Sequence, residues 1–566
     1  MQGLIGPLKE LAEFEELCKN KKKDVGMIRV CGCVNSQKSH MMYALGDGCK
    51  YKVIACSSET KAKQIYEEYR FLDSNTYLYP AKDFLFYQAD IRSKELVKQR
   101  MEGIQAVLSG EPVTVVTSLD GFMDHLAPKE SIAEKVLKVQ NDSVLKLDEM
   151  AEKLSVIGYD REVQVEGPGQ FAVRGGILDI YPLTEELPVR IELWGDEVDS
   201  IRTFDVESQR SIENLMDIVI YPAVEFPQNG EKGVSFLDYF PPEDTILFLD
   251  EPVRLVERGQ NIEDEFMEAQ KKRLESGYDL EEEEAKIFPV TEILKKINCY
   301  SSIGFYALGM KCKGLEVRES YEIQAKSVNP YNNSFEMLTQ DLKRLKRNGY
   351  RVILLSGSRT RAKRLAEDLR DYNLSSYYSE DLDREVKPGE IMTAYGYIAE
   401  GYEYPMLKFT VIAESDIFGK RKKKKKRKTY EGRKIQSFSE LKPGDYVVHE
   451  NHGVGVYQGI EKIVVDKISK DYMKISYADG GNLYILATQL DQIQKYASAD
   501  AKKPKLNKLG GQEWHRTKSK VKTAVWQIAK DLVELYAVRQ SKEGFVYEKD
   551  TVWQKEFEEM FPFEET

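Results

Sequence analysis

The N-terminal part of the chain alternates short apolar, β-branched runs with amphipathic stretches. Apolar runs lie at 27–34, 51–58 and 111–122, and a stretch with helical periodicity lies at 59–72. Strands separated by helices are typical of a parallel sheet with helices packed on its faces. The pattern therefore predicts an α/β domain from Met27 to about Pro128.

After about Pro128 the pattern of predicted strands and helices changes twice. From Leu145 to Pro222 short strands are separated by glycines, which predicts a small, largely antiparallel insertion; the apolar run at 244–255 resumes the α/β pattern. A further α/β unit begins near Glu336, with a strand at Arg351–Leu355 between two helical stretches.

The C-terminal part predicts a small all-β domain and one long helix. Strands of five to seven residues between Gly, Asp and Asn turns at 438–496 predict a barrel of SH3 or Tudor type. Residues 512–540 carry one apolar stripe at helical spacing, formed by Val521, Val525, Ile528, Leu532 and Leu535.

Composition places the chain among multi-domain cytoplasmic proteins. The 566 residues include 42% hydrophobic and 31% charged residues, with a net charge of −11. No apolar run approaches the roughly 18 residues of a membrane helix, so we expect no membrane contact. Seven cysteines, an odd number without paired C-x-x-C motifs, favour a reducing compartment and no metal site.

Nine consecutive basic residues occupy Lys420–Lys428. Removing these nine from the 83 basic residues leaves 74 against 94 acidic residues, a balance of −20. Such a run is either a solvated linker or a loose tether that binds nucleic-acid phosphates, and the sequence leaves both interpretations open.

A degenerate nucleotide-binding motif lies near the N-terminus. A phosphate-binding loop requires G-x-x-x-x-G-K-[ST] between a strand and a helix. Gly32, Lys38 and Ser39 fit this pattern, but Gln37 replaces the second glycine. The apolar strand that ends at Asp250–Glu251 resembles a magnesium-holding strand. Either this is an ATPase core whose site has lapsed, or the two strands are unrelated.

Candidate interface residues lie on the insertion. Arg190, Glu192 and Trp194 share one strand face by period two, and Arg174 lies on a preceding strand. An Arg–Trp cluster is either a protein-binding hot spot or a guanidinium stacked on indole for local stability.

Two segments carry a resemblance to a known family. Residues 171–182 and 190–211 resemble the insertion domain shared by UvrB and the transcription-repair coupling factors, and residues 441–463 resemble the CarD-type module that binds RNA polymerase. Their combination in this order is similar to the bacterial transcription-repair coupling factor family.

The resemblance implies two partner sites and an inactive nucleotide site. It places Arg174, Arg190 and Trp194 at the contact with UvrA, and Gln37 agrees with an inactive site. It also implies that the barrel binds the β subunit of RNA polymerase by pairing a strand with it. The predicted polymerase contacts are Ile460, Glu461, Lys462, Ile463 and Val465. Ile463 is either their apolar anchor or an ordinary barrel-core residue.

The resemblance also implies a division of the chain. The expected segments are a UvrB-like α/β domain 1A with the degenerate P-loop (1–130), the UvrA-binding insertion (131–230), UvrB-like domain 1B (231–320), a small α/β domain (321–418), the basic linker (419–436), the polymerase-interacting barrel (437–498), a long connecting helix (505–541) and the start of a motor (542–566).

Function is expected to follow from this division. Complete family members are ATP-dependent translocases on double-stranded DNA, but this chain stops where the motor would begin. We therefore expect an adaptor in transcription-coupled repair without ATPase activity, with ATP and magnesium confined to the missing motor and the UvrA surface unmasked. The alternatives are a working ATPase that uses Lys38, Ser39, Asp250 and Glu251, and a stand-alone CarD-like transcription regulator.

Overall fold

The computed structural model describes most of the chain. The described residues are 2–21, 24–82, 94–206, 208–227, 230–275, 287–310, 312–419, 433–434, 441, 443–449, 452–465, 468–478, 480–486, 493–496, 504–509, 511 and 513–541. They divide into two compact units, residues 1–429 and 430–566, which are considered separately. The basic run at 420–428, the segment 542–566 and the side chains of Lys462, Ile463 and Val465 lie outside the described part.

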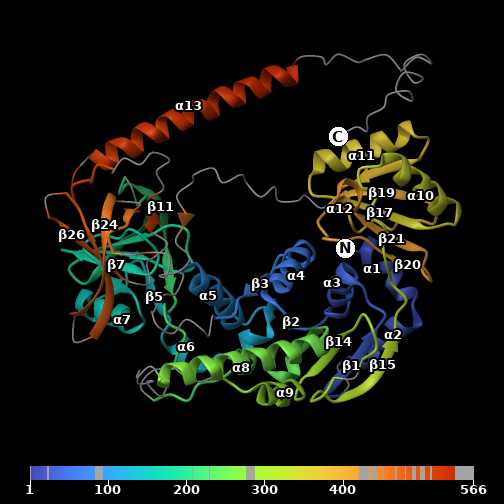
Figure 1. The fold of residues 1–566 in the computed structure, drawn as a ribbon, viewed down its shortest axis with the longest axis horizontal. Helices are drawn as coiled ribbons and strands as arrows, with labels where there is room; N and C mark the ends of the chain where they lie inside the picture. The colour runs from blue at the N-terminus through green and yellow to red at the C-terminus, as the bar shows by residue number, and fades with distance from the viewer. Residues whose placement is uncertain are drawn as a thin grey trace. The chain divides into compact units, whose positions relative to one another are not determined.

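A seven-stranded parallel sheet forms the core of the first unit (Figure 1). Its order is β15-β1-β14-β13-β2-β4-β3. The strands are β1 (Gly26–Cys31), β2 (Tyr51–Cys56), β3 (Thr76–Tyr79), β4 (Val113–Ser118), β13 (Thr245–Asp250), β14 (Ser301–Phe305) and β15 (Val317–Glu322). Every residue of β4 and β13 is buried, as in strands covered on both faces. This parallel sheet, with helices on both faces, agrees with the predicted α/β fold class of the N-terminal part.

The two predicted UvrB-like segments contribute to this one sheet. β13 and β14 come after the insertion in the chain, yet they lie between β1 and β2 in the sheet. The α/β domain is therefore continuous in space and interrupted in sequence.

Helices cover both faces of the sheet. They are α1 (Gln2–Ile5), η1 (Gly6–Glu10), α2 (Ala12–Asn20), α3 (Asn35–Leu45), α4 (Glu59–Leu72), α5 (Lys94–Leu108), η2 (Leu119–Phe122), α6 (Lys129–Glu134), η3 (Phe236–Tyr239), η4 (Pro242–Asp244), α8 (Pro252–Glu275) and α9 (Val290–Ile297). α4 matches the predicted helix; the Ser58 hydroxyl accepts the Lys61 amide and caps its first turn. α5, α8 and α9 pack in one apolar cluster. A second cluster joins α3 and α4 to the following α/β unit.

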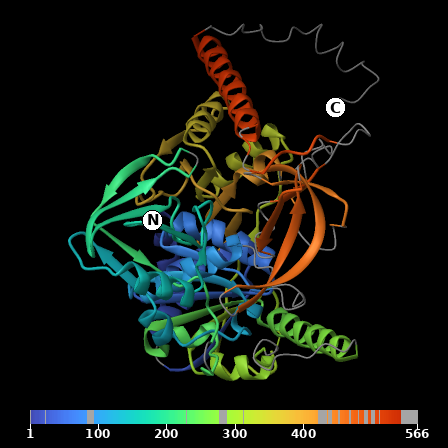
Figure 2. The ribbon, with the colours of Figure 1, turned by 90° about the vertical axis from the view of Figure 1, so that its left-hand side faces the viewer.

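The insertion folds as a β-rich layer with one helix (Figure 2). Its sheet has the order β11-β10-β9-β8-β7-β6, and only the β6–β7 pair is parallel. The elements are β5 (Leu137–Gln140), α7 (Leu147–Val156), β6 (Asp160–Arg161), β7 (Gln170–Arg174), β8 (Ile177–Tyr181), β9 (Val189–Trp194), β10 (Glu197–Phe204), β11 (Ser211–Leu215) and β12 (Asp217–Ile220). α7 packs on its apolar face, and β5 pairs with β12.

The small α/β domain has a mixed sheet of order β16-β20-β21-β17-β19-β18. Its elements are β16 (Lys326–Ser327), α10 (Phe335–Arg347), β17 (Arg351–Ser356), α11 (Arg359–Asp371), β18 (Ser376–Ser379), β19 (Ile391–Tyr395), β20 (Tyr402–Tyr404), β21 (Phe409–Ala413) and α12 (Glu414–Phe418). β20 lies close to the start of α3, where the degenerate P-loop is.

The second unit contains an antiparallel sheet and a long helix. The sheet order is β22-β27-β23-β24-β25-β26. The elements are β22 (Arg433–Lys434), β23 (Tyr446–His449), β24 (Gly453–Val465), β25 (Ile468–Ser476), β26 (Asn482–Leu486), β27 (Ile493–Lys495) and α13 (Glu513–Ser541). α13 confirms the predicted helix, and its apolar stripe is exposed in this unit. In the described part of the chain no helix is long and apolar enough to cross a membrane.

Candidate functional site

The degenerate P-loop connects β1 to α3, as the motif requires. Gly32 adopts a φ of +77°, and a Cβ on it would lie 2.2 Å from the carbonyl oxygen of Ile323. A side chain at this position would therefore collide with the backbone of the segment beside β15. This first glycine is needed for the packing of the loop, whatever the loop binds.

Lys38 is engaged by both predicted acidic residues. Its Nζ lies 2.7 Å from Asp250 Oδ1 and 2.6 Å from Glu251 Oε1. Burial opposes the charge of Lys38, but the two carboxylates outweigh burial and raise its pKa above the ordinary value. The cation that would bind a phosphate is thus already neutralised within the protein.

Gln37 fills the place of the missing glycine with hydrogen bonds of its own. Its Oε1 accepts the Val34 amide at 3.1 Å, and its Nε2 donates to the Tyr404 hydroxyl at 3.0 Å. A loop amide of the kind that holds phosphate in a P-loop is here bound to a side chain of the same loop. Tyr404 comes from β20, so this contact also joins the loop to the small α/β domain.

The hydroxyl that would hold magnesium is also occupied. Ser39 Oγ donates to Glu68 Oε2 at 2.5 Å, and Ser36 Oγ donates to Glu68 Oε1 at 2.7 Å. The Ala399 amide donates to the same Glu68 carboxylate at 3.1 Å. The cavity beside Ser36, Ser39 and Glu68 has a volume of about 10 Å³. Small-molecule sites usually have roughly 300–1,000 Å³.

The structure therefore brings the six predicted nucleotide-site residues into one region. The side chains of the five other than Gly32 are bound to other residues of the protein. Glu68 and Tyr404 complete this network, and sequence reasoning missed both because no motif links them to the loop. Among the described residues no group of three His, Cys, Asp or Glu side chains could hold a metal ion.

The predicted partner-contact residues of the insertion share one solvent-facing side of the sheet. Arg190, Glu192 and Trp194 alternate along β9 with Val189, Ile191 and Leu193, which pack on the apolar core. The alternation agrees with the predicted face.

A buried carboxylate orders the two arginines. Asp179 is 1% exposed and accepts Arg174 Nη2 at 2.5 Å and Arg190 Nε at 2.7 Å. These hydrogen bonds raise the pKa of Arg190. The Arg190 guanidinium stacks on Phe204, 4.5 Å from the ring centroid, and not on the indole of Trp194. Trp194 is 85% exposed. The guanidinium–indole alternative is thus wrong for Arg190, and the indole is accessible to a partner.

The predicted polymerase-binding strand has an unequal pairing along its two edges. β24 pairs with β23 only from Gly453 to Val456, whereas its pairing with β25 runs to Val465. The register shifts between Tyr457 and Gly459, and Gly459 has a φ of +126°, so a bulge separates the two parts. Ladder pairing for Ile460–Val465 is therefore found on one edge only, within the described part of the second unit. Ile460 is 47% exposed, and Glu461 pairs with Lys474 at 2.8 Å.

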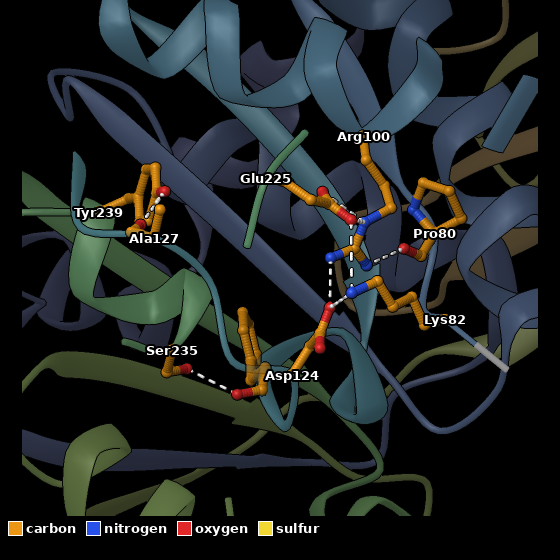
Figure 3. Close-up of polar contacts among 9 residues, drawn as sticks. Pro80, Lys82, Arg100, Asp124, Ala127, Glu225, Ser235 and Tyr239 are labelled. Carbon is orange, nitrogen blue, oxygen red and sulfur yellow. Dashed lines mark hydrogen bonds and ion pairs between the residues drawn. The ribbon is translucent and has the colours of Figure 1, made fainter. Parts of the chain in front are cut away.

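A buried ionic cluster joins the insertion to the α/β core (Figure 3). Arg100 on α5 is fully buried; its Nε lies 2.8 Å from both oxygens of Glu225, and its Nη2 donates to Asp124 at 2.7 Å. Lys82 Nζ lies 3.0 Å from Asp124 Oδ2. Burial opposes ionisation of Asp124, but Lys82 and Arg100 outweigh it and lower its pKa. Sequence patterns missed this cluster because its members are isolated charges in unrelated segments.

Comparisons with known proteins find two domain families and a set of long relatives. Residues 137–226 match the UvrB interaction domain, and residues 441–497 match the CarD-like/TRCF RID domain. A transcription-repair-coupling factor of Bacillus subtilis (strain 168) is 30% identical over 99% of this chain and 52% of its own length. Another from Staphylococcus haemolyticus is 29% identical over 87% of this chain and 47% of its own length. The chain spans about half the length of the curated relatives it matches.

One solved structure, titled as a hypothetical ATP-dependent RNA helicase from Sulfolobus tokodaii, covers 70% of this chain and 82% of its own. Its identity is 10% and its TM-score is 0.20, too low to carry an argument. The chain therefore carries a UvrB interaction domain and a CarD-like/TRCF RID domain, and nearly all of it is similar to part of the transcription-repair-coupling factors.

Proposed function

We propose that this chain, in which a UvrB interaction domain and a CarD-like/TRCF RID domain occur together, is the adaptor part of a transcription-repair coupling factor. Such an adaptor binds a stalled RNA polymerase and recruits the excision-repair protein UvrA to the DNA lesion. The observation that carries the proposal is the presence of both domains, in this order, in one chain that is similar to about half the length of the curated relatives.

In this proposal the insertion binds UvrA through Arg174, Arg190 and Trp194. An exposed indole beside two ordered guanidiniums has the composition of a protein-binding hot spot. Asp179 fixes both guanidiniums before the partner arrives, which reduces the entropy lost on binding. The surface is open in this proposal, since no contact among the described residues covers Trp194.

The second unit binds the β subunit of RNA polymerase by adding a partner strand to the Gly459–Val465 part of β24. An unpaired strand edge supplies main-chain donors and acceptors, and alternate side chains supply specificity. Ile460 is the exposed apolar side chain described on this segment. Whether Ile463 contributes an anchor stays a prediction.

We propose that ATP binding and hydrolysis do not take place in this chain. In the proposal this chain binds no ATP, because its own side chains occupy the positions of phosphate and magnesium. ATP and magnesium serve a motor, which moves along double-stranded DNA in the longer cytoplasmic protein.

The test is a binding assay with purified UvrA and with a fragment of the polymerase β subunit. Arg190→Ala is expected to weaken UvrA binding tenfold or more and to leave polymerase binding unchanged, since truncating a hot-spot residue costs about 2 kcal/mol or more. Ile460→Arg is expected to do the reverse. Val521→Arg is the control, because Val521 is 56% exposed on α13, outside the sheet that contains β24.

Binding of neither partner would refute the adaptor function. Binding of polymerase alone would favour a stand-alone CarD-like regulator. Stabilisation by ATP would favour an enzyme that uses Lys38, Ser39, Asp250 and Glu251.

A further inference from the structure

The solvent-facing side of the insertion continues beyond the predicted contact residues. Trp194 pairs with Glu197, and Glu197 also forms an isolated bridge with Val144. Directly opposed residues of antiparallel strands place their side chains on the same face. Val144 and Trp194 therefore flank Glu197 on one surface, 77% and 85% exposed respectively.

A groove of about 500 Å³ begins beside this row. It is lined by Asn141, Glu192, Asp199, Ser200, Ile201, Arg202, Asn214, Leu215 and Met216. Glu192 precedes Trp194 by two residues on the same strand face, so the groove and the indole belong to one surface. Met216 is 77% exposed and completes an apolar rim with Val144 and Trp194.

Charge divides this surface into two ends. At the Arg174–Arg190 end, two guanidiniums share the single carboxylate of Asp179 and leave an excess positive charge. The groove lining has the two carboxylates of Glu192 and Asp199 against the one guanidinium of Arg202, which pairs with Glu192. Glu197, opposite Trp194, adds a third carboxylate beside the groove.

We infer that this groove, with its rim of Val144, Trp194 and Met216, is the second half of the partner-binding surface. It accepts a basic side chain flanked by apolar side chains of a protein partner, while the arginine end accepts an acidic group. The inference rests on the proposed function, because the groove is continuous with the Arg174–Arg190–Trp194 site. The excess of carboxylates favours the basic side chain, and the exposed apolar rim favours the apolar side chains that flank it.

The experiment measures UvrA binding to the full chain by biolayer interferometry. Met216→Arg and Val144→Arg are each expected to raise Kd tenfold or more, because they remove apolar contact and oppose a basic side chain. Val163→Arg is the control; Val163 is 88% exposed, follows β6 at the opposite edge of the sheet, and its replacement is expected to change Kd less than twofold. Asp199→Asn is expected to reduce the salt dependence of the association rate.

The outcomes separate the inference from the function. If Arg190→Ala abolishes binding but Met216→Arg and Val144→Arg behave like Val163→Arg, the groove is not part of the site and the adaptor function stands. If the unmodified chain does not bind UvrA, both fail. The side chains of Met216, Val144, Val163 and Asp199 are exposed, whereas that of Arg190 is partly buried. An unchanged thermal unfolding midpoint verifies that each variant folds.

Discussion

Replacing Glu225 by Ala tests whether the buried cluster of Figure 3 holds the insertion onto the α/β core. Glu225 is 2% exposed and faces Arg100, which is fully buried. With Lys82 and Asp124, the cluster has two cations and two anions. Removing Glu225 leaves one buried positive charge without a counter-charge.

The expected cost follows from this charge balance. Breaking a buried ion pair by removing one partner costs about 3–5 kcal/mol. If the free energy of local opening at the junction falls by this amount, amide exchange there accelerates roughly 10²- to 4 × 10³-fold, since each 1.4 kcal/mol is about a factor of ten.

Hydrogen–deuterium exchange measures this opening directly. The Ala127 amide donates to the Glu225 carbonyl at 2.9 Å, so its exchange reports separation of the two segments. The control is Lys135→Ala, which removes the partly exposed ion pair between Lys135 and Glu231, whose charged atoms lie 4.0 Å apart. Its loss is expected to cost under about 1 kcal/mol of stability. A double variant, Arg100→Leu with Glu225→Leu, is expected to exchange more slowly than Glu225→Ala, because no unpaired charge remains.

Wild-type exchange at Ala127 in the Glu225→Ala variant would refute the argument. It would mean that apolar packing alone holds the junction and that the ionic cluster contributes nothing to its stability.

Three further predictions concern the predicted nucleotide site and the residue that follows it on α3. Gln37→Gly is expected to gain no ATP-dependent thermal stabilisation, because Lys38 stays paired with Asp250 and Glu251. Gly32→Ala is expected to destabilise the protein by at least about 1–3 kcal/mol in thermal unfolding, since it combines an unfavourable φ with a backbone collision. His40 follows Ser39 on α3, and its Nδ1 lies 3.1 Å from the Tyr404 hydroxyl oxygen. Burial lowers the pKa of His40 to about 4 from 6.5, so the unfolded chain binds more protons between these pH values. Stability is then expected to fall by about 3 kcal/mol from pH 6.5 to pH 4, and His40→Asn should flatten this dependence in melting curves.

Each of these has a contradicting result. If millimolar ATP raises the thermal unfolding midpoint of Gln37→Gly, the Gln37 side chain alone prevents ATP binding in the unmodified chain. Gly48→Ala is the control for Gly32, because Gly48 has a φ of +73° with no atom near its Cβ position. Equal losses of stability in Gly32→Ala and Gly48→Ala would show that the collision with the Ile323 carbonyl contributes nothing. Parallel pH curves for wild type and His40→Asn would assign the acid sensitivity to the carboxylates.

The fold was predictable where local pattern and burial agree. β-branched runs predicted buried parallel strands such as β4, and spacing predicted α4 and α13 closely. The position of β13 and β14 between β1 and β2 was not predictable, since periodicity has no information on strand order.

The candidate site was predictable only as far as a motif extends. Spacing within one loop identified Gly32, Lys38 and Ser39, and the end of an apolar strand identified Asp250. Tyr404 lies 367 residues after Gln37, and no local pattern connects them. The face of Arg190 followed from period two, but its stacking on Phe204 depends on the register of β9 and β10.

The strand order of the α/β core determines when during synthesis its sheet can close. β1, β2 and β4 leave the ribosome first. β1 and β2 are not neighbours in the sheet, so they become part of one sheet only when β14 and β13 have been made and fill the two places between them. From residue 118 to residue 305 the ribosome adds 187 residues, which takes about 10–40 s at ~5–20 residues per second. Residues 137–226 emerge within this interval, so the insertion can fold while the domain that carries it is still incomplete. The edges of β1 and β2 stay unpaired throughout this time, and unpaired strand edges favour aggregation of a nascent chain and its binding by chaperones.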